Sequence, residues 1–307
     1  MRVAVVDIGT NSTRLLVCDL EDGRVTREIE RRSEVTRLGV GVDADGRLGQ
    51  ESMNRVYRTL DTYRELIDRH GADRAVAVLT SAARDAANGR EFADSVKERY
   101  DLEPHVISGD REAELTFLGA TSERDPDDQT PILVIDIGGG STEIVIGTGH
   151  TPSFHVSTQA GVVRQTERHI HSDPPTQAEL EETREDVNET IRDGVPGAQR
   201  RAVQHAIAVA GTATSLGAIA QGLEPYDPDK VHGYHLTRDE CQRILDHLAS
   251  IPLEERRRVP GLDPARAPTI VAGVIILLEV LALFGLDAVE VSEHDILRGA
   301  ALGLAVG

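Results

Sequence analysis

Apolar residues in this chain form two patterns, short continuous runs and longer stretches with one apolar residue in every three or four. The run at residues 3–6 stops at a polar segment, residues 7–12, and apolar residues resume at 15–17. This pattern predicts a β-hairpin with a small polar turn. Residues 52–69 have the three-four spacing instead, which predicts a helix with one apolar face. Together the two patterns indicate a mixed α/β protein.

Further elements are predicted in the same way. Strands are expected over residues 75–79, 105–107, 207–210 and 288–291, and helices over 108–121, 268–284 and 295–305. Thr176 with Glu179, and Thr237 with Glu240, have the spacing of capping boxes and predict two more helix starts. The apolar run 270–278 is too short to span a bilayer, so we expect a buried helix and no membrane segment.

Residues 123–131 are polar and flanked by proline, which is typical of a boundary between domains. We therefore expect an N-terminal lobe over residues 1–124 and a C-terminal lobe over 125–294. The closing helix, within 295–307, is expected to pack back onto the first lobe.

The most informative feature is an internal repeat. The segment Val-Val-Asp-Ile-Gly-Thr-Asn-Ser-Thr-Arg, from Val5, aligns without gaps with Val-Ile-Asp-Ile-Gly-Gly-Gly-Ser-Thr-Glu, from Val134. A turn that contains Gly and Ser can direct several backbone N–H groups at one oxyanion, and glycine lets the backbone approach a phosphate closely. Two facing turns of this kind would hold neighbouring phosphoryl groups. The alternative is two ordinary hairpin turns, which the in-register duplication disfavours.

Charge and motif content exclude several classes of protein. The formal net charge of −19 argues against a general nucleic-acid binder, which needs a basic face. A polyanionic ligand would therefore depend on local arginines, Mg²⁺ and backbone N–H groups. The chain has no Walker A loop, no dinucleotide-binding glycine loop, no nucleophile elbow and no His-Glu-x-x-His.

The two cysteines, Cys18 and Cys241, fit neither a disulfide framework nor a metal site built from cysteine ligands. With no signal-peptide pattern at the start of the chain, a cytoplasmic protein is the expectation. Cys18 falls in an apolar strand and is expected to pack rather than to act as a nucleophile.

Five segments resemble, in order, the motifs of the exopolyphosphatase/guanosine pentaphosphate phosphatase (Ppx/GppA) family. They are Asp7-Ile-Gly-Thr-Asn-Ser, Thr80-Ser-Ala-Ala-Arg-Asp-Ala, Ser108-Gly-Asp-Arg-Glu-Ala, Asp136-Ile-Gly-Gly-Gly-Ser-Thr-Glu and Ala210-Gly-Thr-Ala-Thr-Ser. The resemblance implies the acetate/sugar kinase, Hsp70 and actin fold. It comprises two actin-like lobes, each a mixed β-sheet flanked by helices, with a cleft between them, here in the short two-domain form.

The resemblance assigns two catalytic residues. Glu112 matches the general base that activates the attacking water, and Arg84 matches a phosphate-binding arginine. From the residues alone, Glu112 could be a first-turn acid favoured by the helix dipole, and Arg84 could pair with Asp85 on the surface.

Asp136 and Glu143 match the positions at which the family holds Mg²⁺, with Mn²⁺ as a substitute. Both offer hard oxygen ligands from the two arms of one hairpin. The alternatives are a turn residue that bonds its own loop and an acid at a strand edge. Arg164 is a further candidate cation and could equally be a solvated helix residue. The rest of the expected phosphate cradle is Asp7, Gly9, Thr10, Asn11, Ser12, Gly138, Gly139, Gly140, Ser141, Gly211 and Thr212.

The segment near the C-terminus departs from the family pattern, Val-Ser-x-x-Gly-Leu-Arg-Glu-Gly. Here it reads Val291-Ser-Glu-His-Asp-Ile-Leu-Arg-Gly, with Asp295 replacing a glycine. We expect the closing helix to survive after a different turn, and His294 to be a surface residue rather than a ligand.

Three functions remain open on this evidence. The first is an Mg²⁺-dependent exopolyphosphatase that acts on inorganic polyphosphate, with short chains favoured because the longer members' accessory domain is missing. The second is hydrolysis of a (p)ppGpp-type nucleotide, guanosine pentaphosphate. The third is an ATP-binding kinase or Hsp70-like module with a purine pocket around residues 211–216. A homodimer is the default guess for the assembly, with no residue pattern behind it.

Overall fold

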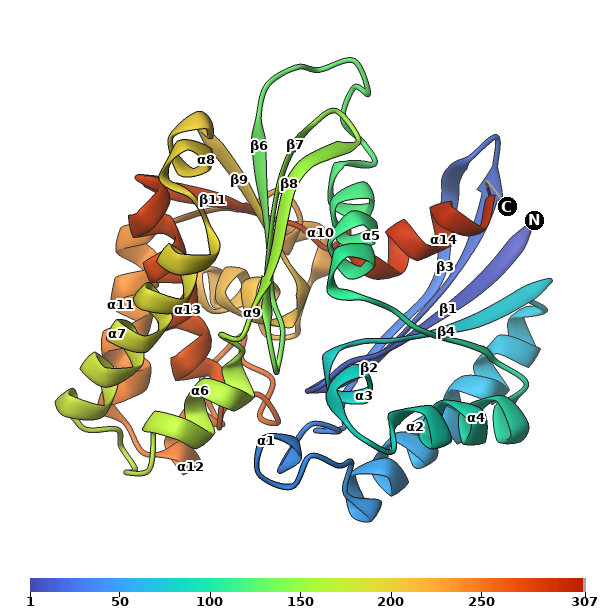
Figure 1. Cartoon of the computed structure of the whole chain (residues 1–307), viewed down its shortest axis with the longest axis horizontal. Coiled ribbons are helices and arrows are strands. Elements are labelled where there is room, and N and C mark those ends of the chain that lie inside the picture. The colour runs from blue at the N-terminus through green and yellow to red at the C-terminus, as the bar shows by residue number, and fades with distance from the viewer. Residues whose placement is uncertain (306–307) are drawn as a thin grey trace. The chain divides into compact units, whose positions relative to one another are not determined.

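The chain forms two compact units, seen in Figure 1, a computed structural model that describes residues 1–305. Unit 1 comprises Met1–Glu123 together with the C-terminal segment that begins at His294. Unit 2 comprises Arg124–Glu293. Each unit contains one β-sheet with helices packed against it.

The sheet of unit 1 has five strands in the order β3-β2-β1-β4-β5. The strands are β1 (Arg2–Ile8), β2 (Ser12–Glu21), β3 (Arg24–Val35), β4 (Arg74–Leu79) and β5 (Glu103–Val106). The first three form an antiparallel meander, and β4 and β5 run parallel to β1. The central strand β1 is therefore hydrogen-bonded on both sides, and it ends at the first glycine turn.

Helices cover both faces of this sheet. Apolar residues of α2 (Gln50–His70) and α4 (Gly89–Tyr100) share a core with Ala4, Val6 and Ile8 of β1. The residues between them, Val3 and Val5, point to the other face and pack with α5 (Gly109–Thr121) and α14 (Ile296–Ala305). Because β1 is covered on both sides, its sequence is a continuous apolar run rather than an alternating one. The short helices α1 (Val42–Asp45) and α3 (Ser81–Asp85) lie in connections.

The sheet of unit 2 has six strands in the order β10-β11-β9-β6-β7-β8. The strands are β6 (Ile132–Ile137), β7 (Thr142–Thr148), β8 (Thr151–Thr158), β9 (His205–Val209), β10 (His235–Thr237) and β11 (Ala288–Val291). Read as β8-β7-β6-β9-β11, this is the arrangement of unit 1, a three-stranded meander followed by two parallel strands. The ten-residue sequence repeat is thus part of a duplicated sheet, to which unit 2 adds β10 as an antiparallel edge.

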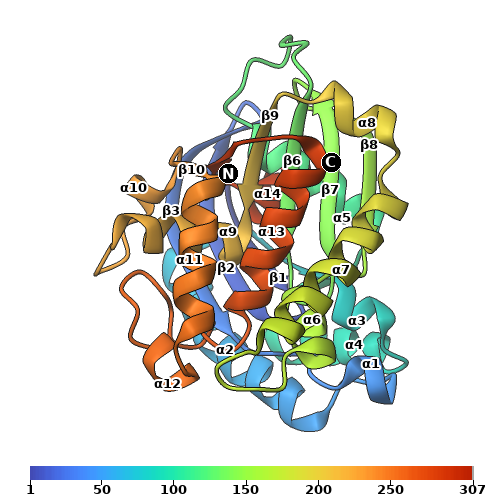
Figure 2. The same ribbon diagram turned by 90° about the vertical axis from the view of Figure 1, so that its left-hand side faces the viewer.

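Most helices of unit 2 gather around α13 (Ile270–Phe284), which is buried along nearly its whole length. Figure 2 shows α13 beside α7 (Gln177–Gly194) and α11 (Arg238–Ser250), in front of the sheet. Both expected capping boxes are present, at the starts of α7 and α11. The remaining helices are α6 (Val162–His169), α8 (Gly197–Ala202), α9 (Ala210–Gln221), α10 (Pro228–Val231) and α12 (Leu253–Arg256).

The predicted elements are present, with differences at their ends. The strand expected over 207–210 stops at Val209, because Ala210 has a left-handed backbone (φ 64°) and opens α9. The helices expected from residues 268 and 295 begin at Ile270 and Ile296. The edge strands β3 and β8 were not predicted, since β3 is largely polar and the apolar alternation of β8 is limited to Phe154 and Val156. Within residues 1–305, no helix is both long and apolar enough to cross a membrane.

Helices α5 and α14 touch backbone to backbone at two glycines. A Cβ on Gly299 would lie 1.8 Å from the carbonyl oxygen of Leu115, and one on Gly119 would lie 1.9 Å from that of Asp295. No side chain fits at either position without moving a helix. Position 299 therefore needs glycine in this chain.

Gly299→Ala should lower the free energy of unfolding by about 3 kcal/mol, the upper end of the usual cost of overpacking. Gly303→Ala, in the same helix, is the matched control, because its Cβ would meet nothing closer than 3.6 Å. The control should be neutral or slightly stabilising, since alanine is the better helix former. Denaturant unfolding measures both, and equal stabilities for the two variants would contradict the backbone contact.

Both cysteine thiols should be unreactive in the folded protein. Burial raises the pKa of Cys18 to about 12, with the nearby Glu28 adding to the shift, and burial likewise raises that of Cys241 to about 12. Because only the thiolate reacts, a thiol reagent at pH 8 should label the native protein slowly. Labelling after denaturation should reach two thiols quickly, and equally fast labelling of the native protein would contradict the buried positions.

Candidate active site

The two glycine turns have the same backbone hydrogen bond. In unit 1 the Gly9 N–H donates to the Ser12 carbonyl at 2.9 Å, and in unit 2 the Gly138 N–H donates to the Ser141 carbonyl at 2.9 Å. Each turn joins the first two strands of its sheet. The sequence repeat therefore encodes one turn geometry twice.

The first turn is fixed by neighbouring backbone. The Thr10 hydroxyl accepts a hydrogen bond from the Ala82 N–H at 3.2 Å, and the Thr10 carbonyl accepts one from Gly39 at 2.9 Å. The Asn11 carbonyl accepts from the Arg37 N–H at 2.8 Å. Thr10 thus anchors the turn to the backbone at Ala82 and Gly39. The Asn11 Oδ1 atom is buried without a hydrogen-bond partner in the described part of the chain.

The two carboxylate oxygens of Asp7, near the end of β1, differ in their hydrogen bonding. Its Oδ2 atom accepts hydrogen bonds from Nε and Nη2 of Arg14, at 2.8 and 2.5 Å. Its Oδ1 atom is buried and has no partner among the described residues. Burial raises the pKa of Asp7 above its usual value, and the charge of Arg14 opposes this shift.

The two residues expected to be catalytic lie together in unit 1. Arg84 Nη1, from α3, donates to Glu112 Oε2, from the first turn of α5, at 2.9 Å and to the Ile107 carbonyl at 3.3 Å. Glu112 is only 7% exposed, so it is not a solvated first-turn acid. The alternative pair of Arg84 with Asp85 also exists, but at a longer 3.6 Å.

The two residues expected to hold a metal face each other in unit 2. Asp136 on β6 and Glu143 on β7 are directly opposite partners in the antiparallel ladder, so their side chains share one face of the sheet. Both are buried, and the Ser157 hydroxyl donates to Glu143 Oε1 at 2.8 Å. Since β7 lies between β6 and β8, the interpretation of Glu143 as a strand-edge acid is wrong. Two opposed carboxylates with hard oxygen atoms fit a divalent cation such as Mg²⁺.

The same pair of positions carries opposite chemistry in the two units. Asp7 faces Arg14 in the β1–β2 ladder, as Asp136 faces Glu143 in the β6–β7 ladder. The duplicated hairpin therefore holds an internal ion pair in unit 1 and a pair of acids in unit 2. The sequence repeat contained this difference at its last position, but Arg14 was not among the predicted site residues.

The second turn is backed by the start of α6. The N–H groups of Val162 and Val163 donate to the carbonyls of Gly138 and Gly139, each at 2.9 Å. Arg164 Nε donates to the Gly140 carbonyl at 2.9 Å, so this side chain lies against the turn rather than in solvent. These contacts satisfy the carbonyls of all three glycines of the turn.

Gly211 and Thr212 lie at the start of α9, in the same unit. The Thr212 hydroxyl donates to the carbonyl of Ile137, the last residue of β6, at 3.2 Å. The guanidinium of Arg266 packs directly on Gly211, where a Cβ would lie 2.0 Å from its Nη1 atom. No motif of the sequence singled out Arg266, because it comes from an ordinary polar connection before α13.

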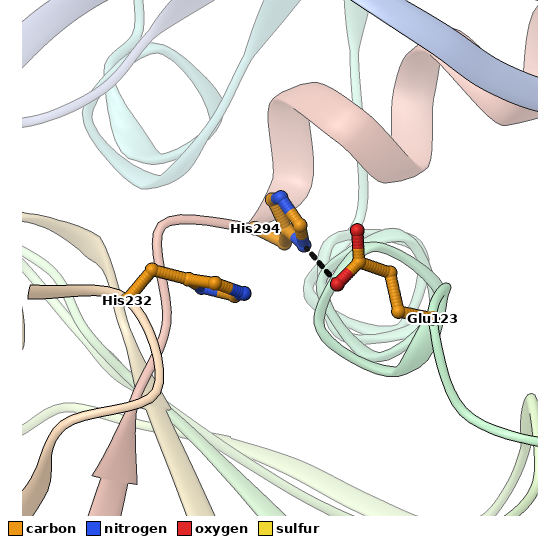
Figure 3. Close-up of side chains that lie close together, drawn as sticks. All are labelled: Glu123, His232 and His294. Carbon is orange, nitrogen blue, oxygen red and sulfur yellow. Dashed lines mark ion pairs between the residues drawn. The ribbon is translucent and has the colours of Figure 1, made fainter. Parts of the chain in front are cut away.

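The segment after β11 corrects one expectation. His294 was expected at the surface, but its side chain is only 13% exposed. It lies 3.8 Å from Glu123 through Nδ1, an ion pair marked in Figure 3, and 3.0 Å from Arg298 Nη1 through Nε2. Arg298 also contacts Glu28 and Glu123, each at 3.2 Å. The atypical C-terminal segment is thus integrated into unit 1 by charged contacts.

Comparisons with known proteins agree with this architecture. The sequence profile of the Ppx/GppA phosphatase family matches residues 16–304. Exopolyphosphatase 2 of Mycobacterium tuberculosis is 37% identical over 316 aligned residues, covering 99% of this chain and 98% of the relative.

Solved structures give the same result. The Aquifex aeolicus member of the Ppx/GppA family superposes with a TM-score of 0.82 at 33% identity, covering 100% of this chain and 98% of that one. An exopolyphosphatase from Cytophaga hutchinsonii superposes with a TM-score of 0.88 at 27% identity, again over 100% and 98% of the two chains.

The duplicated mixed sheets are therefore two actin-like lobes, as the resemblance implied. With its paired Arg84 and Glu112 and its two glycine turns on this fold, the chain belongs to the Ppx/GppA phosphatase family and is a phosphoanhydride hydrolase.

Proposed function

We propose that this protein is an Mg²⁺-dependent exopolyphosphatase that releases orthophosphate from the end of inorganic polyphosphate. The observation that carries the proposal is the partly buried hydrogen bond of 2.9 Å between Arg84 and Glu112. Arg84 lies on α3, and α3 is joined to the first glycine turn by the bond from the Ala82 N–H to the Thr10 hydroxyl. The similarity to Exopolyphosphatase 2 over nearly the full length of both chains supports the choice of substrate. Family membership favours a hydrolase over an ATP-dependent kinase or Hsp70-like module.

Glu112 is proposed to act as the general base. Its carboxylate is held by Arg84 Nη1, and it accepts a proton from the water that attacks the terminal phosphorus. Arg84 has the planar guanidinium that suits a phosphoryl group, and it is proposed to stabilise the negative charge that develops there. Phosphoryl transfer needs mainly positioning and charge stabilisation, which two fixed side chains can supply.

The glycine turns and the two acids of unit 2 are proposed to bind the substrate's charge. Backbone N–H groups of Gly139, Gly140 and Ser141 are candidates for phosphate oxygens, as are those of the corresponding residues 10–12 in unit 1. Asp136 and Glu143 are proposed to hold Mg²⁺, which supplies the positive charge that a phosphoanhydride needs when bound to so acidic a protein.

Guanosine pentaphosphate is the alternative substrate. Phosphate release from short polyphosphate, long polyphosphate and the nucleotide, measured side by side under the same Mg²⁺ concentration, tests the proposal. A higher kcat/KM for polyphosphate is expected. A clear preference for the nucleotide would overturn the proposed substrate without affecting the roles of the side chains.

Glu112→Gln should lower kcat by about a hundredfold to ten-thousandfold, the usual contribution of a general base, while polyphosphate binding remains measurable. Glu114→Gln is the matched control, because Glu114 lies on the same helix and bonds only the exposed Arg111 in the contacts described. The control should keep normal turnover. Normal turnover of a folded Glu112→Gln protein would remove Glu112 as the base.

Asp136→Asn should raise the Mg²⁺ concentration needed for half-maximal activity at least about tenfold, because metal sites depend strongly on each buried carboxylate. Calorimetric titration of the protein with Mg²⁺ gives an independent readout. Asp127→Asn, at an exposed position of the same unit, is the control. Identical Mg²⁺ titrations for all three proteins would exclude Asp136 as a ligand.

A further inference from the structure

One arginine of unit 1 is shared by two buried aspartates. Arg14 binds Asp7 Oδ2 through Nε and Nη2, at 2.8 and 2.5 Å, and binds Asp295 Oδ2 through Nη1. Asp7 and Asp295 are each only 3% exposed. The two aspartates come from opposite ends of the chain, and Arg14 is the link between them.

Asp295 is itself held in place. Its Oδ1 atom accepts a hydrogen bond from the Leu297 N–H at 3.0 Å and lies 3.9 Å from Arg31 Nη1. Its carbonyl oxygen is against Gly119, where a Cβ would be only 1.9 Å away. Because α5 and α14 are in backbone contact at this point, the Asp295 carboxylate is presented to Arg14 from a rigid position.

The other end of this chain of contacts is the first glycine turn. Asp7 lies directly opposite Arg14 in the β1–β2 ladder, two residues before Gly9. Within the described residues, Asp7 Oδ1 and Asn11 Oδ1 are buried without hydrogen-bond partners. Unsatisfied buried oxygens are costly and usually await a ligand, an ion or water. The Asp7 carboxylate therefore borders the turn, and its bonds to Arg14 set its orientation.

We infer that Asp295 is a positioning residue for the first phosphate-binding turn. It fixes the guanidinium of Arg14, and Arg14 in turn holds Asp7 Oδ2, the oxygen that would lie 3.9 Å from a Cβ on Gly9 of the turn. The inference rests on the proposed function, since it gives the turn a part in phosphoanhydride hydrolysis. It goes beyond that function by assigning a task to a residue that replaces a glycine of the family pattern.

If Asp295 acted only through its charge, it would hinder the binding of polyphosphate rather than support catalysis. A buried negative charge near an anion-binding turn opposes the binding of a polyanion. If Asp295 were only a bystander, its removal would lower the KM for polyphosphate and leave kcat unchanged. If it positions Arg14 and Asp7, its removal lowers kcat, because a small misplacement of binding groups is costly in rate.

The test uses Asp295→Asn, which has the same shape and keeps an oxygen for the Leu297 N–H but loses the charge that binds Arg14. Asp295→Ser, which can also cap the helix, is the second variant. Steady-state kinetics with polyphosphate, corrected for the folded fraction, should show a fall in kcat of about tenfold to a hundredfold without a fall in KM.

Asp19→Asn is the matched control. Asp19 lies on β2 with Arg14 and forms an ion pair with Arg2, its Oδ1 atom 2.9 Å from Arg2 Nε. This control removes an ion pair from the same sheet at the end far from the turn, so it should leave kcat and KM at their wild-type values.

A double-mutant cycle separates positioning from a general loss of structure. If Asp295 acts through Arg14, adding Asp295→Asn to Arg14→Gln should lower kcat no further, because the two changes break one chain of contacts. Independent, multiplying effects on kcat would overturn the inference. So would a fall in KM at unchanged kcat, or the failure of both Asp295 variants to fold, which would show a purely structural role.

The kcat and KM of each variant are compared with those of the wild-type enzyme, measured with either polyphosphate or guanosine pentaphosphate. If the wild type cleaves only the nucleotide, the proposed substrate is wrong, but the variants can still be compared with the wild type on that substrate. If the wild type is active and the Asp295 variants match it, only the positioning role fails.

Discussion

The charge balance of a buried aspartate at the end of the first strand determines much of this structure. Each unit places a buried acid, Asp7 or Asp136, two residues before the first glycine of its turn. A buried carboxylate without compensating positive charge costs several kcal/mol. The residue opposite that acid on the neighbouring strand is therefore decisive, and it differs between the two units.

In unit 1 the compensating cation is built into the chain. Arg14 occupies the opposite position and is itself held by Asp295 at the start of α14. This contact ties the C-terminal helix to a sheet made from the first part of the chain. In unit 2 the opposite position carries a second acid, Glu143, and Mg²⁺ is the proposed counter-charge there. One duplicated hairpin thus holds an internal ion pair in one unit and two opposed acids in the other.

The proposed catalytic pair is placed by a different part of unit 1. Arg84 and Glu112 follow the parallel strands β4 and β5, whose ends lie beside the end of β1 because all three strands run in the same direction. Parallel order brings the ends of successive strands to one edge of the sheet, where ligands bind in open α/β sheets. The backbone bond from Ala82 to Thr10 joins this edge to the first turn. The site of unit 1 is therefore a consequence of sheet topology as well as of side-chain chemistry.

The sequence by itself determined the elements and the repeat, because hairpins, capping boxes and apolar helices depend on neighbours within a few residues. Through the family motifs that it resembles, it also proposed Glu112, Arg84, Asp136 and Glu143 as site residues. Only the tertiary structure decided the partners of Arg14, Asp295 and His294. Their contacts join segments up to 281 residues apart, so no local pattern encodes them. The polar edge strand β3 was missed for a related reason, because its pairing with β2 rather than its own composition makes it a strand.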